Sequence, residues 1–94
     1  MDAFLRKLQL AIGRAVNEGF PVVVCGENEN KEIKAGYFEK DSLTDDEINQ
    51  MDYVWCDVVK LDPEKRKIIS RTRYERKGGN NKMVATQGHL TWNK

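Results

Sequence analysis

The sequence has few of the residues that usually carry out catalysis or hold metal ions. Its 94 residues include one histidine, two cysteines and two prolines. A catalytic nucleophile needs a base that a third group orients. The single histidine, His89, lies in a C-terminal tail that we expect to be mobile. Two cysteines with one distant histidine do not make a zinc site. We therefore expect no enzyme, no metal ion and no other cofactor.

Long hydrophobic runs are also lacking. A membrane-spanning helix needs about 18 consecutive apolar residues, and no run in this sequence approaches that length. Asp2, Arg6 and Lys7 interrupt the apolar residues at the N-terminus, so we expect no signal peptide. Cys25 and Cys56 lie in apolar strand patterns, where free thiols pack as small hydrophobic side chains. These features predict a cytoplasmic protein without membrane contact.

The apolar residues that are present follow helix and strand periods. In residues 1–18 they recur at steps of three and four, which predicts an amphipathic helix. Asp2 can cap its start, and Gly19 ends it. The continuous apolar run Phe20–Cys25 predicts a strand buried on both faces. Residues 32–39 alternate weakly and predict a second strand, which pairs with the first as a hairpin.

Gly36 inside this second strand is a candidate position for a β-bulge. Residues 41–52 predict a short helix, because Thr44 and Glu47 have the spacing of a capping box. Acidic residues in the first turn suit the positive end of the helix dipole. Their spacing does not match a calcium loop, so we interpret them as a helix start rather than a metal site.

Two β-rich runs, residues 53–61 and 66–76, predict a central antiparallel hairpin around Asp62–Lys65. If Pro63 and Glu64 form its loop, Trp55 lies opposite Thr72, and Asp57 lies opposite Ser70. An error of one residue in this register would exchange the two faces of the strand. After a turn at residues 77–82, Met83–Thr86 predicts a last short strand.

Together these elements predict one α+β domain over residues 1–94. An N-terminal amphipathic helix packs on an antiparallel sheet of four to five strands, in the order α-β-β-α-β-β-β and linked by successive hairpins. One helix covers one face of a sheet. We therefore expect an exposed apolar patch on the other face and self-association through it, because such patches mark partner or dimer interfaces.

The net charge of +1 hides a strong asymmetry along the chain. Residues 1–59 carry six Lys or Arg and twelve Asp or Glu, a net charge of −6, whereas residues 60–94 carry ten and three, a net charge of +7. Such asymmetry bears on electrostatic partners rather than on the fold. Two interpretations stay open: the halves neutralise each other within one chain or a dimer, or the basic half binds an anionic partner.

Two functions fit these features. The first is a protein-interaction module: an inhibitor, adaptor or antitoxin-like regulator, as a monomer or a homodimer, of a kind common in phages and mobile elements. The second is nucleic-acid binding through the basic strand and loop at residues 66–82. The pI of about 7.7 favours the first, because dedicated nucleic-acid-binding domains usually have a pI above about 9. The candidate partner-binding residues are Tyr53, Trp55, Arg71, Arg73, Tyr74, Arg76, Lys77 and Lys82.

Overall fold

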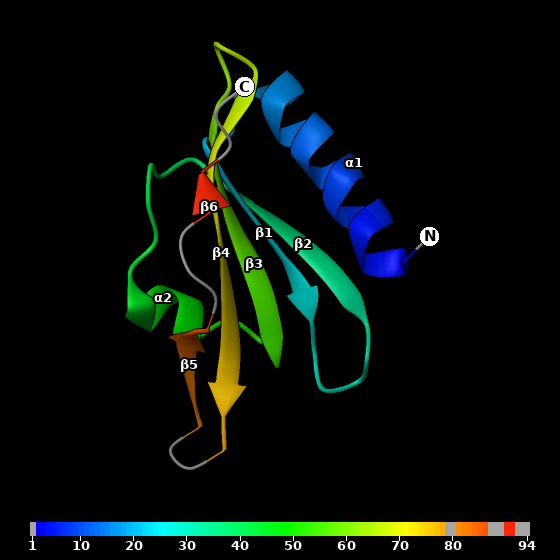
Figure 1. Cartoon of the computed structure of the whole chain (residues 1–94), viewed down its shortest axis with the longest axis vertical. Coiled ribbons are helices and arrows are strands. Elements are labelled where there is room, and N and C mark those ends of the chain that lie inside the picture. The colour runs from blue at the N-terminus through cyan, green and yellow to red at the C-terminus, as the bar shows by residue number, and fades with distance from the viewer. Residues whose placement is uncertain (1, 79–80, 87–89, 92–94) are drawn as a thin grey trace.

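The computed structural model describes residues 2–78, 81–86 and 90–91. Within these residues a single antiparallel sheet has the strand order β2-β1-β3-β4-β5, and the short β6 also pairs with β4 (Figure 1). Along the chain the elements are α1 (Ala3–Glu18), β1 (Val22–Glu27), β2 (Ile33–Phe38), α2 (Asp45–Asn49), β3 (Trp55–Asp62), β4 (Lys67–Lys77), β5 (Lys82–Ala85) and β6 (Leu90–Thr91). The predicted α+β fold and its element order are confirmed. None of the helices in the described ranges is long and apolar enough to cross a membrane.

β1 lies in the centre of the sheet, between β2 and β3. It is buried from Val22 to Gly26, and a continuous apolar strand is stabilised most when neighbours cover both of its edges and both of its faces. β2 carries Lys34 and Gly36 and takes the edge, where a charge and a glycine are tolerated. The prediction that successive hairpins set the strand order is therefore wrong between β2 and β3. The bulge expected at Gly36 is also wrong, because the register between β1 and β2 is continuous.

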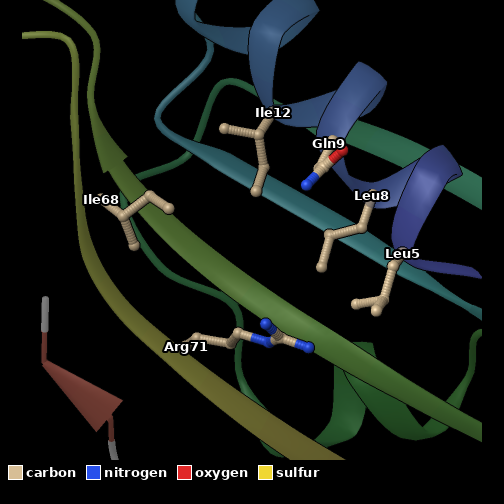
Figure 2. Close-up of a pocket in the computed structure, with 6 residues that line it drawn as sticks. All are labelled: Leu5, Leu8, Gln9, Ile12, Ile68 and Arg71. Atoms are coloured by element: carbon tan, nitrogen blue, oxygen red, sulfur yellow. The ribbon is translucent and has the colours of Figure 1, made fainter. Parts of the chain in front are cut away.

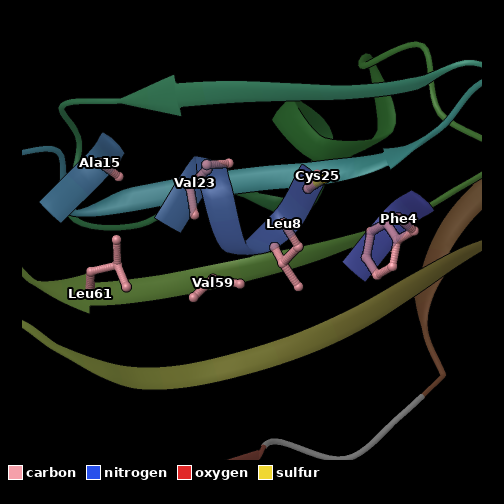
Figure 3. Close-up of a cluster of buried hydrophobic side chains, with 8 residues drawn as sticks. Phe4, Leu8, Ala15, Val23, Cys25, Val59 and Leu61 are labelled. Atoms are coloured by element: carbon pink, nitrogen blue, oxygen red, sulfur yellow. The ribbon is translucent and has the colours of Figure 1, made fainter. Parts of the chain in front are cut away.

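α1 covers one face of this sheet. The Phe4 amide donates a hydrogen bond of 2.8 Å to Asp2 Oδ1, and Gly19, with φ at 84°, ends the helix in the left-handed conformation. Both predicted helix ends are confirmed. The buried side of α1 packs on β1 and β3 in one cluster (Figure 3). Its buried residues are Phe4, Leu8, Ala11, Ala15, Val23, Cys25, Val59 and Leu61.

The second face of the sheet is covered as well, by α2 and its flanking segments, which pack there on a cluster that includes Met83 of β5 (Figure 1). The capping box of α2 is confirmed: the Glu47 amide donates to Thr44 Oγ1, and the Thr44 amide donates to Glu47 Oε1. Ile48 of α2 is buried in a second cluster, against which Leu43 and Met51 pack. The expectation of one uncovered sheet face is therefore wrong. Ile48, Leu43 and Met51 cover this face, although acidic residues surround them in the sequence.

The hairpin of β3 and β4 has a different register from the predicted one. Asp62 lies opposite Lys67, so the loop has four residues, and Arg66 at its end has a positive φ of 54°. An irregularity between Lys60 and Leu61 shifts the register once more. Asp57 therefore lies opposite Arg73 instead of Ser70, and Trp55 lies opposite Glu75 instead of Thr72. Position 66 has no glycine or asparagine to indicate a positive φ, so the sequence did not predict the longer loop.

Both cysteines are buried free thiols, on opposite faces of the sheet, as their strand patterns indicated. Burial raises the pKa of the Cys25 thiol from 9.0 to about 11 and that of Cys56 from 9.0 to about 12. Between pH 9 and 11 the thiols of the unfolded chain ionise, whereas those of the folded chain stay protonated.

We therefore predict that the free energy of unfolding falls as pH rises through this window, by about 1 kcal/mol per thiol at pH 10. Urea unfolding at pH 8 and pH 10 measures the loss, which should be smaller in a Cys25→Ala variant. Equal stability of the wild-type protein at both pH values would contradict this prediction.

Candidate interaction surface

An apolar groove runs between α1 and β4. The backbone of α1 lies closest to β1 and β2, and its buried side chains also reach β3, so the helix leaves the part of this sheet face formed by β4 beside it. The groove has a volume of about 380 Å³, and Figure 2 shows side chains from α1 and β4 facing each other across it. Its lining residues are Leu5, Leu8, Gln9, Ile12, Ile68 and Arg71.

The exposed wall of this groove is a flank of α1. Leu5, Gln9 and Ile12 are spaced by three and four residues, which places them on one side of the helix, next to its buried stripe. Leu5 remains 41 % exposed, and Ile68 on the opposite wall is half-buried. An apolar strip of this kind, open to solvent beside a polar rim, is typical of surfaces that bind partners.

Two arginines outside the lining contact α1. Arg66 from the β3–β4 loop donates through Nη2 to Asn17 Oδ1 at 3.1 Å, which joins the loop to the end of α1. The Arg73 guanidinium lies 4.5 Å from the ring centroid of Trp55 and 5.7 Å from that of Phe4. The two rings meet edge to face at 4.7 Å.

A shared carboxylate lies beneath the groove. Asp57 on β3 is only 1 % exposed, and two arginines of β4 bind it. Arg71 contacts Asp57 Oδ2 through Nε at 2.8 Å and through Nη2 at 2.6 Å. Arg73 donates to Oδ1 through Nε and to Oδ2 through Nη2 at 3.3 Å. The hydrogen bond with Asp57 raises the pKa of Arg73, so the cluster of two guanidinium groups and one carboxylate carries a net positive charge.

The aromatic residues predicted for partner binding lie on both faces of the sheet. Trp55 packs on the α1 side, half-buried, and its Nε1 donates to Glu27 Oε1 at 2.9 Å. Tyr53 and Tyr74 pack instead on the second cluster. The Tyr53 hydroxyl donates to the Lys34 carbonyl at 3.2 Å. The structure therefore brings Trp55, Arg71 and Arg73 together on the α1 side of the sheet, where Arg71 lines the groove, and separates them from the two tyrosines.

Arg76, predicted for the same surface, binds the interior of the protein. Its guanidinium donates to the carbonyl oxygens of Tyr53 at 3.0 Å, Met51 at 3.1 Å and Asn49 at 3.2 Å, to Asn49 Oδ1 at 3.2 Å and to the Asn81 carbonyl at 2.8 Å. It thus holds the segment after α2 against the tip of β4 and β5. Lys77 and Lys82 are exposed and pair with each other across that tip. His89 lies outside the described residues.

Replacing Arg76 with Lys should loosen this segment, because an ammonium group cannot reproduce a planar fork of donors. We expect a loss of about 1–2 kcal/mol in stability and faster amide hydrogen exchange at residues 49–54 and at Met83, whose amide donates to Asn49 Oδ1. Lys77→Ala, at the exposed neighbouring position, serves as the control. Wild-type exchange rates in Arg76→Lys would show that the clamp contributes nothing.

Several residues of the groove escaped sequence analysis. Leu5 and Ile12 belong to the apolar stripe of α1, which was assigned to the core as a whole. The sequence does contain a signal for the ion pairs of Asp57, because this lone carboxylate lies in an apolar strand whose hairpin partner carries Arg71 and Arg73. The predicted register placed Asp57 opposite Ser70, so these ion pairs were not predicted.

No family model, curated protein or solved structure matches this chain.

Proposed function

We propose that this protein is a small, non-enzymatic interaction module of the cytoplasm, which acts by binding a larger protein as an inhibitor, adaptor or antitoxin-like regulator would. The observation that carries the proposal is the apolar groove between α1 and β4, with Leu5 exposed and Arg71 in its wall. Apolar and aromatic side chains together with arginines are the usual anchors of protein interfaces.

The alternative function, nucleic-acid binding through residues 66–82, has weaker support. Phosphate binding needs basic side chains that are available to the backbone of a nucleic acid. Asp57 neutralises one of the two positive charges of Arg71 and Arg73, and Arg76 is bound to main-chain carbonyl groups. Arg66, Lys67, Lys77 and Lys82 are exposed, but the first two lie at the start of β4 and the other two at its far end, so each pair makes only a small site for a polyanion.

The proposal differs from the interface expected from the sequence. Self-association was expected through an uncovered face of the sheet, but Ile48, Leu43 and Met51 pack on that face. We therefore propose the groove, on the α1 side, as the partner surface.

Oligonucleotide binding separates the two functions. The purified, nuclease-treated protein is titrated with labelled single- and double-stranded oligonucleotides at salt concentrations from about 50 to about 200 mM, where phosphate contacts lose affinity steeply. We expect no micromolar binding at the lowest salt concentration. Micromolar binding with a steep salt dependence, weakened in a Lys77→Gln, Lys82→Gln double variant, would overturn the proposal in favour of the alternative.

A further inference from the structure

The groove has a charge preference that follows from the cluster beneath it. Asp57 is almost completely buried, and its carboxylate is shared by two guanidinium groups whose side chains are 20 % and 29 % exposed. One positive charge at Arg71 and Arg73 is therefore not balanced by Asp57. Glu75 is a further carboxylate whose charge acts on Arg73. Arg66, in the β3–β4 loop, has the uncharged Asn17 side chain as its partner.

Arg71 is the residue that combines this charge with the apolar lining. It lies in the wall of the groove opposite Leu5 and Gln9, and Figure 2 shows its guanidinium extending from β4 towards α1. It holds Asp57 through Nε and Nη2. A guanidinium group has five donors in a planar fork that matches a carboxylate, so Arg71 can hold a buried carboxylate and still face a second one.

We propose that the groove takes an acidic, apolar segment of a protein partner. Apolar side chains of that segment pack between α1 and Ile68, while one carboxylate binds at Arg71 and Arg73. This inference rests on the proposed function and names the chemistry of its partner. A nucleic-acid backbone fits the groove poorly, because it presents a charge at every nucleotide, whereas Arg71 is the single charged residue among the described residues that line the groove.

A random linear peptide library displayed on phage tests the proposal. Selection uses the full-length wild-type protein, with counter-selection on a Gln9→Trp variant, in which an exposed position of the groove wall is filled. We expect the enriched peptides to combine Leu, Ile or Phe with at least one Asp or Glu. A synthesised peptide should bind Arg71→Gln at least about tenfold more weakly than wild type. It should bind Lys77→Gln, a charge removal away from the groove, as tightly as wild type.

Enrichment of neutral or basic peptides, or no enrichment against the counter-selected variant, would overturn the proposal. Equal affinity for wild type and Arg71→Gln would do the same. If Arg71→Gln fails to fold, two other results give the same information. The peptide should not bind Gln9→Trp, and wild type should bind the peptide less tightly once its acidic residue is changed to Asn or Gln. The oligonucleotide titration distinguishes the two failures. If the proposed function fails, the wild-type protein binds oligonucleotides in the salt series. If only this inference fails, it does not.

Discussion

Replacing Asp57 with Ala is expected to destabilise the protein by about 3 kcal/mol. The change removes a carboxylate that is 1 % exposed and leaves Arg71 and Arg73 half-buried without their shared partner. Both guanidinium groups have some access to water, so we place the loss at the lower end of the range for broken buried ion pairs. Urea unfolding followed by circular dichroism measures it.

The matched control for this prediction is Asp41→Ala, at an exposed position, where we expect a change within about 0.5 kcal/mol. Asp57→Asn separates charge from shape, because it keeps the side-chain volume and removes the negative charge. It should show most of the loss seen in Asp57→Ala. Wild-type stability of Asp57→Asn would mean that the two arginines do not depend on the carboxylate.

Gly26→Ala is expected to abolish folding or to cost more than about 3 kcal/mol. A Cβ atom at Gly26 would lie 2.3 Å from the Trp55 carbonyl oxygen, 2.5 Å from Cys56 Cβ and 2.7 Å from Cys56 Cα. These atoms belong to the neighbouring β3 strand, so the two central strands of the sheet would have to separate. Because β1 and β3 form the centre of both core clusters, no local adjustment relieves the overlap.

Gly13→Ala provides the opposite result in the same protein. No atom lies within 4 Å of a Cβ built at Gly13, which is an exposed interior position of α1. Alanine there should raise the stability by about 0.5–1 kcal/mol, because it lowers the conformational entropy of the unfolded chain. Thermal unfolding of the two variants beside wild type tests both. A folded Gly26→Ala protein with the wild-type melting temperature would show that β1 and β3 are not packed as described.

Local signals in the sequence predicted most elements of the fold. Asp2 and Gly19 mark the two ends of α1, and Thr44 with Glu47 marks the start of α2. These signals involve residues within one turn of each other, so a single sequence contains them in full. Strand order is not local: whether β3 pairs with β1 or with β2 depends on the path of the connection at residues 39–54. That connection also carries the apolar residues that cover the second face.

The candidate surface was predicted only in part, for a reason that lies in the register. Trp55, Arg71 and Arg73 were assigned to partner binding, and they lie beside the groove. The predicted register would place Tyr53 and Tyr74 on the same face as Trp55. The one-residue shift at Lys60 and Leu61 instead moves Tyr74 to the other face, and Tyr53 precedes β3, so strand alternation does not fix its face. A groove between a helix flank and a strand depends on how the two elements pack, which periodicity does not show.

Crosslinking from inside the groove tests the central claim most directly. Gln9, in the lining, is replaced by the photoreactive residue benzoylphenylalanine in the full chain, and irradiation takes place in cells of the organism that encodes the protein. Leu10 is the control position, because it is 70 % exposed and lies on the solvent side of α1. Our account predicts a discrete protein adduct from position 9, none from position 10, and loss of the adduct when Arg71 is also changed to Gln. Equal adducts from both positions, or an adduct that nuclease removes, would contradict it.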